Sequence, residues 1–176
     1  MILLCGTLIV FAQLSFMRSQ SLGVKTNQTL VVKFPGHTEG LNTKLEAMKK
    51  TIARLPLVYQ VTFSGAVPGE EVATFLSNRR TNDALKQNRL YEMLACDPDY
   101  VDAYGLQVVA GRNFSEDYGD DVDKLVINET AVRNLGFTSN DEAIGELVNV
   151  ECTDAPMQII AVSYTHLRAH ETAANL

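Results

Sequence analysis

The sequence predicts a mixed α/β (α+β) domain with a mixed sheet and two small lobes, preceded by an apolar helix. Three observations favour this class. The chain has 176 residues, of which 46% are hydrophobic and 20% charged, as expected for a globular domain with a real core. Short apolar runs with strand character alternate with helical patterns from residue 28 onwards. The stretch 97–145 carries most of the capping and turn residues that begin and end regular elements.

The first element is the uncharged run 2–17, ILLCGTLIVFAQLSFM, in which Gln13 is the one strongly polar residue. A membrane-spanning helix needs about 20 apolar residues. A secretory signal peptide is an alternative, but no basic segment precedes the run and no clean cleavage site follows it. A buried globular helix is a second alternative. We favour a transmembrane helix truncated by the start of the sequence and continuing outward as a stalk, with 1–21 as its bounds.

Residues 28–64 predict a strand, a helix and a second strand. The run 28–34 (QTLVVKF) is apolar and β-branched, which indicates a buried strand. Residues 39–55 have helical spacing, and 57–64 alternate apolar and polar residues as a half-buried strand does. We expect a βαβ unit with a right-handed crossover, which builds the first lobe together with returning strands. The apolar stripe of the helix is Leu41, Leu45, Met48, Ile52 and Leu55.

The second lobe is expected from about residue 65 to residue 125. Within it, 65–89 is the least determined segment: 72–76 fits a short strand or one helical turn, and the polar run that follows fits a surface loop or hairpin. A strand over 90–96 then leads into the stretch 97–145.

Two helices are predicted in the stretch 97–145. Asp97 indicates the N-cap of a short helix over 98–104, which Pro98 begins and Gly105 ends. A strand over 106–110 follows and ends at Gly111.

The second of these helices spans 129–135, between the cap Asn128 and the terminator Gly136. A buried strand over 124–127 precedes it. Two further strands, 147–151 and 157–162, complete the domain.

The polar and aromatic residues of this stretch have structural explanations. Tyr100 and Tyr104 lie four residues apart on one face of the short helix, so with Leu106 they can anchor it to a sheet. Arg112 is expected to pair with the acidic loop that follows it or to bond exposed carbonyls, rather than to bind a ligand.

The charge balance argues against nucleic-acid binding. The net charge is −6 and the pI is about 5.0, whereas phosphate contacts need clustered basic residues. The one basic cluster lacks stacking aromatic residues, which favours a solvated surface. It consists of Arg79, Arg80, Lys86 and Arg89.

The cysteines are too few and too scattered for a disulfide framework or a zinc site. Cys5 lies in the apolar N-terminal run, and Cys96 and Cys152 fall in predicted strands. The latter two would be able to pair in an oxidising compartment, but we favour two unrelated buried thiols.

Patterns for catalysis, cofactors and metals were not found. The sequence has no P-loop, no GxGxxG and no nucleophile elbow. The acidic loop suggests calcium, but Gly119 falls where an EF-hand needs its second oxygen ligand. His166 and His170 have a helical metal spacing without a third ligand. We therefore predict no catalytic, cofactor-binding or metal-binding residues. The loop acids are Glu116, Asp117, Asp120, Asp121 and Asp123, and the remaining histidine is His37.

Several segments in a fixed order resemble a known family. These are DPDYVDAYGLQVVAGRNF, an acidic loop, LVINETAVRNLGF and EAIGELV, and the segment GTLIVFAQLSFMRSQSLGVKTNQTLVVKFP resembles the end of a transmembrane helix with a first strand. Together they resemble the MacB-like periplasmic core domain of ABC transporter permeases, within the FtsX-like permease family. The resemblance covers roughly residues 2–162.

The resemblance implies a non-enzymatic extracytoplasmic domain of a permease in the bacterial inner membrane, with its main domain in the periplasm. ATP would be hydrolysed by a separate nucleotide-binding subunit or domain. The resulting motion of the transmembrane helices would drive export or release of an envelope substrate. The implied partners are an ABC ATPase subunit, a permease partner or second copy of the chain, the membrane, and a periplasmic or envelope protein. No cofactor and no nucleic acid are expected.

The resemblance also sets the expected domain bounds, 22–162 for the periplasmic core. The tail 163–176 (SYTHLRAHETAANL) departs from the family pattern, so we expect it to be foreign sequence. We further expect the chain to be a fragment of a longer permease.

Two other functions remain as alternatives. One is a membrane-anchored binding module of unrelated origin. The other is an envelope hydrolase that uses the carboxylates of Asp97–Asp102 or Glu116–Asp123. An acid–base pair needs surroundings that separate its two pKa values, which a helix start and a polar loop do not supply.

Overall fold

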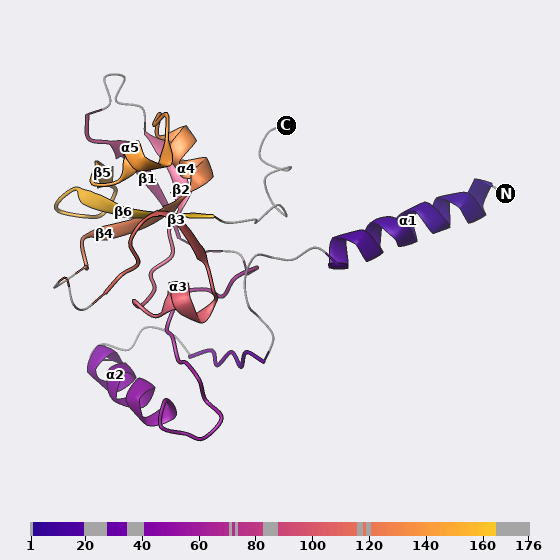
Figure 1. Cartoon of the computed structure of the whole chain (residues 1–176), viewed down its shortest axis with the longest axis horizontal. Coiled ribbons are helices and arrows are strands. Elements are labelled where there is room, and N and C mark those ends of the chain that lie inside the picture. The colour runs from indigo at the N-terminus through magenta and orange to yellow at the C-terminus, as the bar shows by residue number, and fades with distance from the viewer. Residues whose placement is uncertain are drawn as a thin grey trace.

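A single sheet with short helices packed on it forms the centre of the molecule (Figure 1). The structure is a computed structural model that describes residues 2–19, 28–34, 41–70, 72, 74–82, 88–115, 118 and 121–164.

The sheet has six strands in the order β2-β1-β5-β6-β3, and β4 pairs with β6 off this path. The β4–β6 pair is parallel and the other pairs are antiparallel, so the predicted mixed sheet is confirmed. The strands are β1 (Phe75–Arg80), β2 (Arg89–Glu92), β3 (Gln107–Gly111), β4 (Lys124–Asn128), β5 (Leu147–Val150) and β6 (Met157–Tyr164).

Strand β6 is the centre of the core because it pairs with β3, β4 and β5. Its residues 159–163 are all buried, as a continuous apolar run requires in a strand covered on both faces. Ile159 and Val162 pack with Val132 and Phe137, which come from α4 (Glu129–Asn134) and the turn after it. The helix α5 (Asn140–Ala143) covers the same core with Ala143, which is fully buried.

The predicted start and end of the helix after β4 are confirmed. The Asn128 side chain accepts a hydrogen bond from the Ala131 N–H at 2.7 Å, as an N-cap should. Gly136 follows the helix with a φ of 83°. This left-handed conformation is open to glycine and strained for most other residues.

Glycine is required at the end of β3 by a close approach to β6. Gly111 has a φ of 81°, and a Cβ there would lie 2.0 Å from the Ile160 carbonyl oxygen. The β3–β6 register shifts between Val108 and Ala110, just before this contact. The predicted breaker Gly111 is therefore the last residue of β3, in the place where two backbones nearly touch.

Two tyrosines lie together in the short helix α3 (Tyr100–Ala103) and at its C-cap, and their predicted anchoring to the sheet stays a prediction. Tyr100 and Tyr104 are both buried, with ring centroids 4.9 Å apart. Burial raises the pKa of the Tyr100 hydroxyl to about 12, with smaller contributions from Tyr104 and Cys96. Both tyrosines are therefore buried as neutral phenols.

The described ends of the polar run after residue 76 lie in two paired antiparallel strands, which agrees with a hairpin, one of the two predicted outcomes, while 83–87 lie outside the described residues. Strands β1 and β2 pair in register from Phe75 with Glu92 to Asn78 with Arg89. The predicted strand over 90–96 is shorter, since β2 ends at Glu92.

The predicted strands 28–34 and 57–64 are wrong. Between them, α2 (Leu41–Ile52) is present as expected. The flanking segments instead lack sheet partners in the described structure, apart from a bridge between Ser64 and Cys96. Leu30 is 87% exposed and Tyr59 98% exposed, so their apolar patterns are not buried by a neighbouring strand. The expected βαβ unit of the first lobe therefore does not form, and all six described strands lie in one sheet.

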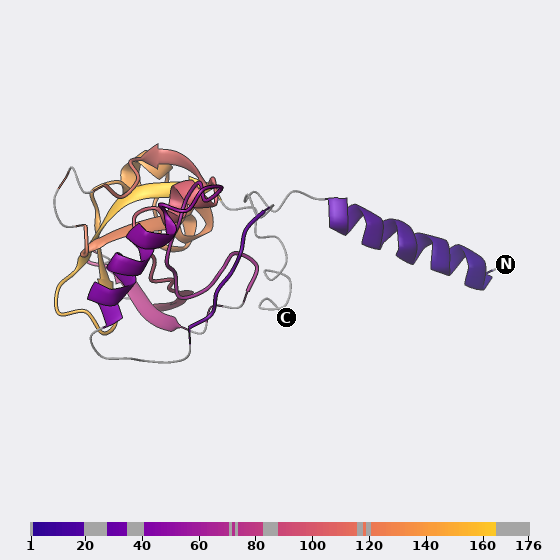
Figure 2. The same cartoon turned by 90° about the horizontal axis from the view of Figure 1, so that it is seen from below.

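The N-terminal run forms α1 (Ile2–Ser19), which stands away from the rest of the chain in both views (Figure 2). Its described side chains, over 4–16, are all exposed. Within the described residues, no helix is long and apolar enough to cross a membrane.

Strand β6 extends into the first two residues of the expected foreign tail. Strand β6 runs through Tyr164, and Ser163 is buried at 5% exposure. Residues 163 and 164 therefore belong to the sheet. The remainder of the expected foreign tail, 165–176, lies outside the described residues.

All three cysteines are free thiols. Cys152 and Cys5 are exposed and Cys96 is partly buried, so the prediction of a buried Cys152 is wrong. Burial, with a contribution from the charge of Asp97, raises the pKa of the Cys96 thiol to about 11.

Candidate functional site

The Asp97 carboxylate accepts three hydrogen bonds from distant parts of the chain. One oxygen accepts a hydrogen bond from Thr62 Oγ1 at 2.5 Å. The other accepts from Lys49 Nζ at 2.6 Å and from the Phe63 N–H at 3.0 Å. The prediction that Asp97 caps α3 is therefore wrong, because donors from distant parts of the chain occupy its carboxylate. The N-cap position falls to Asp99, whose side chain makes no capping bond.

Lys49 links the two aspartates. Its Nζ lies 2.6 Å from Asp97 Oδ2 and 2.5 Å from Asp99 Oδ2. Burial works to lower the pKa of Lys49, but hydrogen bonds to Asp97 and Asp99 outweigh it and raise the pKa above its usual value. Lys49 is therefore a stable cation between two carboxylates.

This arrangement gives no support to acid–base chemistry at Asp97–Asp102. Both oxygens of Asp97 are engaged by protein donors, and Asp102 lies exposed on α3. A general base needs an oxygen within hydrogen-bond reach of the proton that it removes. The geometry fits a structural contact between segments.

The acidic loop is held by Arg112. Its guanidinium donates two hydrogen bonds of 2.8 Å to the Asp121 carboxylate and lies 4.3 Å from the centre of the Tyr118 ring. The Ser115 N–H donates to the same carboxylate at 3.1 Å. Hydrogen bonds from Arg112, aided by Ser115, hold the pKa of Asp121 at about 2. The predicted pairing of Arg112 with the acidic loop is confirmed.

The described residues contain no group of three or more side chains able to hold a metal ion. Three residues of the acidic loop, Glu116, Asp117 and Asp120, lie outside the described residues. So do the histidines His37, His166 and His170.

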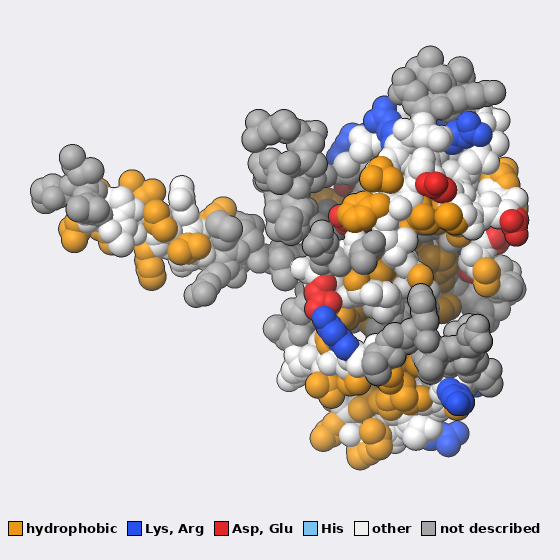
Figure 3. All heavy atoms as spheres, turned by 180° about the vertical axis from the view of Figure 1, so that it is seen from behind, with side chains coloured by type: hydrophobic (Ala, Val, Ile, Leu, Met, Phe, Trp, Pro, Cys, Tyr) orange, Lys and Arg blue, Asp and Glu red, His pale blue; other side chains and the backbone are white. Residues whose placement is uncertain are grey.

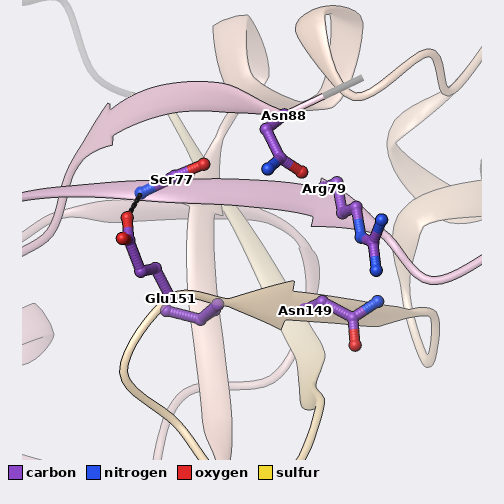
Figure 4. A pocket seen from close by; sticks show the side chains of 6 residues that line it. Ser77, Arg79, Asn88, Asn149 and Glu151 are labelled. Carbon is purple, nitrogen blue, oxygen red and sulfur yellow. Dashed lines mark hydrogen bonds between the residues drawn. The ribbon is translucent and has the colours of Figure 1, made fainter. Parts of the chain in front are cut away.

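A polar hollow lies on the strands β2, β1 and β5 (Figure 4). Its volume is about 310 Å³. At one end, the Ser77 N–H donates to Glu151 Oε2 at 3.1 Å. At the other end, Arg79 lies opposite Asn149 in the strand register. The lining residues are Ser77, Arg79, Asn88, Asn149, Val150 and Glu151.

The hollow lies on a part of the sheet that α4 and α5 do not cover, since these helices pack on β3, β4 and β6. Its guanidinium, carboxamide and carboxylate groups can donate and accept hydrogen bonds at an open surface. Three half-exposed apolar side chains from the same strands, Phe75, Leu90 and Leu147, accompany them. Polar groups mixed with apolar side chains are suited to contact with another molecule.

The predicted basic cluster is divided between two environments. Arg79 lines the hollow. Arg80 instead pairs with Glu146 at 3.0 Å and with Glu142 at 3.5 Å, and its guanidinium lies 4.3 Å from the Phe137 ring centre. Lys86 lies outside the described residues.

A second group of exposed apolar side chains lies away from the hollow. Figure 3 shows hydrophobic side chains gathered at the lower end of the molecule, where the segment after α2 lies. In this segment, Leu57 is 92% exposed and has a φ of 77°.

Comparison with known proteins decides the family. No curated protein matches the chain. A sequence model of the MacB-like periplasmic core domain matches residues 2–173. The chain belongs to this family. The match confirms the resemblance stated from the sequence and, at its C-terminal end, reaches into the expected foreign tail.

One solved structure shares the fold of this chain, and a second is similar to it more weakly. The extracellular domain of the noncanonic ABC-type transporter YknZ from Gram-positive bacteria is 19% identical, with a TM-score of 0.51. That match covers 68% of this chain and 60% of the YknZ domain. The periplasmic region of MacB from Actinobacillus actinomycetemcomitans is 18% identical, with a TM-score of 0.48, over 74% of this chain and 58% of that one. The MacB-like chain thus spans under two thirds of either relative.

Proposed function

We propose that this MacB-like domain is the periplasmic part of a permease subunit that couples ATP-driven motion in the membrane to export or release of an envelope substrate. The ATP is hydrolysed by a separate ABC ATPase subunit, and the permease works with a second permease or a second copy of itself in the inner membrane. The observation that carries this proposal is the family match over residues 2–173.

The geometry supports a mechanical and binding role. The carboxylates that attracted attention in the sequence, Asp97 and Asp121, are both engaged by protein donors. The polar hollow on β1 and β5 is open, which suits contact with another protein or an envelope substrate. The helix α1 stands away from the sheet and is suited to connect the domain to the membrane (Figure 2).

The test begins with the complete gene and its neighbours. We expect further hydrophobic spans downstream of this domain and an ATPase reading frame beside it. The full-length permease should co-purify with that ATPase and hydrolyse ATP in lipid nanodiscs. A Walker-motif variant of the ATPase, which binds but does not hydrolyse ATP, is the matched control.

Different results would point elsewhere. A complete gene without further spans or a neighbouring ATPase would contradict the permease proposal and favour a membrane-anchored binding module. Turnover of an envelope substrate by the purified domain, lost on Asp99→Ala, would instead favour the hydrolase alternative.

A further inference from the structure

The segment 41–64, which contains α2, is attached to the later chain at one place. Hydrogen bonds join the backbones of Phe63 and Asp97, and of Gly65 and Ala95, at 2.9 and 2.8 Å. The side chains of Lys49 and Thr62 also donate hydrogen bonds to the Asp97 carboxylate. The Gln60 side chain donates to the Asp99 carbonyl oxygen at 3.4 Å. Among the described residues, the polar contacts from 41–64 to the chain beyond residue 66 end within 95–99.

Helix α2 is connected to the rest of the domain in a different way from α4 and α5. The helices α4 and α5 pack on the strands, whereas α2 does not pack on the sheet in that way. Figure 1 shows α2 on the far side of α3 from the sheet. The orientation of α2 relative to the core therefore depends strongly on the contacts at residues 95–99.

Among the described side chains of α2, Lys49 makes the long-range polar contact to the later chain. It spans 48 residues of sequence to reach Asp97, and the two side chains are only 17% and 14% exposed. Shielding from water strengthens an ion pair and reduces its screening by salt. This contact is therefore firmer than an exposed pair such as Lys33 with Glu70, whose side chains are 73% and 45% exposed.

A short hydrogen-bonded path leads from Asp97 into the sheet. Tyr100, three residues later, is buried, and its ring lies tilted against that of Tyr104. The Leu106 N–H donates to the Val101 carbonyl oxygen at 2.8 Å, which fixes the step from α3 into β3. Because β3 pairs with β6, this path connects Asp97 to the central strand.

We propose that Lys49, Thr62, Phe63, Asp97 and Asp99 form a joint, the Asp97 joint, that transmits displacement of the α2 segment to α3 and the sheet. This inference rests on the proposed coupling function and assigns its transmission within the domain to particular residues. Lys49 acts as the positioning residue, since its ammonium group sets the orientation of α2 against the two carboxylates.

The first measurement tests the joint without ATP. Spin labels are placed on Glu46→Cys and Asn134→Cys in the full-length permease, with the native cysteines changed to serine. Lys49→Met should broaden the α2-to-α4 distance distribution. Lys50→Met, a change at the neighbouring exposed residue, should leave it narrow, and Lys49→Arg should restore it. A distribution that stays narrow in Lys49→Met overturns the joint.

The second measurement tests transmission. The permease and its ATPase are placed in nanodiscs, and the distance from a label on α4 to one on a membrane-embedded helix is compared with and without ATP. The parent and Lys50→Met should show an ATP-dependent shift, and Lys49→Met should lose at least half of it while retaining ATP hydrolysis. A full shift in Lys49→Met overturns the joint alone. No shift in the parent overturns the proposed function, and the transmitting role with it.

Discussion

Replacing Gly111 by alanine tests the close approach of β3 to β6. The new Cβ would lie 2.0 Å from the Ile160 carbonyl oxygen, 2.9 Å from Ile144 Cδ1 and 3.0 Å from Ala161 Cα. Two of these neighbours are backbone atoms of the central strand, so they cannot move aside as a flexible side chain would. The substitution must separate β3 from β6 or distort both.

The expected loss of stability in Gly111→Ala has two parts. A non-glycine residue at a φ of 81° costs about 1–2 kcal/mol of conformational strain. Forcing a methyl group into a filled space costs about 1–3 kcal/mol more. The free energy of unfolding should therefore fall by about 2–5 kcal/mol, a large share of the stability of an ordinary domain.

Gly136 provides a matched control. It has a similar φ of 83°, but a Cβ there meets nothing within 4 Å. Gly136→Ala should lower the free energy of unfolding by the conformational strain alone, about 1–2 kcal/mol. The difference between the two variants isolates the steric contact with β6.

Urea unfolding followed by circular dichroism measures both variants, since the chain has no tryptophan for fluorescence. With a denaturant slope of about 2 kcal/mol per molar, Gly111→Ala should unfold roughly 0.5–1.5 M earlier than Gly136→Ala. Equal midpoints would refute the close approach of the two backbones.

Three further predictions follow from single contacts. Asn128→Ala should lower the free energy of unfolding by about 1 kcal/mol through loss of the α4 cap, and Asn128→Ser should recover most of it in the same urea assay. Since the pKa of Asp121 is lowered to about 2, its contribution is present above pH 4 and lost as the pH falls toward 2; a melting-temperature profile over pH 2–6 should be flatter in Asp121→Asn. Iodoacetamide at pH 8 should modify exposed Cys152 well before Cys96, whose pKa of about 11 leaves roughly one thiolate in a thousand, and equal rates by peptide mass spectrometry would contradict this.

Local signals predicted the later part of the chain well. The cap Asn128 bonds a neighbour three residues away, and Tyr100 and Tyr104 meet within one helical turn. The apolar run of β6 is long enough to indicate a buried strand by itself. These interactions depend on residues close in sequence, so their patterns are visible without the fold.

The predictions that proved wrong depend on interaction partners that are distant in sequence. The run 28–34 has strand composition, but a strand needs a neighbour to bond with, and none lies beside it in the described structure. Asp97 has the local pattern of an N-cap, yet Lys49 and Thr62 reach its carboxylate across 48 and 35 residues. The local sequence pattern does not show whether a carboxylate accepts from a nearby backbone N–H or from a donor that only the fold brings close.

The polar hollow was missed for the same reason. Its side chains come from 77–79, 88 and 149–151, and they meet because β1 lies between β2 and β5. Nothing in the spacing of Arg79 and Asn149 indicates that they are opposite each other. The signal that would have found them is the strand order.

The central place of β6 has a consequence for how the protein is made. Among the described strands, β3 and β4 pair with β6 alone, and β5 pairs with β6 and β1, yet residues 157–164 are synthesised after all three. During synthesis, the β2-β1-β5 part of the sheet and the short helices can form before β6 emerges, whereas β3 and β4 have no strand to pair with until then. The core therefore assembles late, and an emerging chain exposes the apolar faces of β3 and β4 until β6 is made.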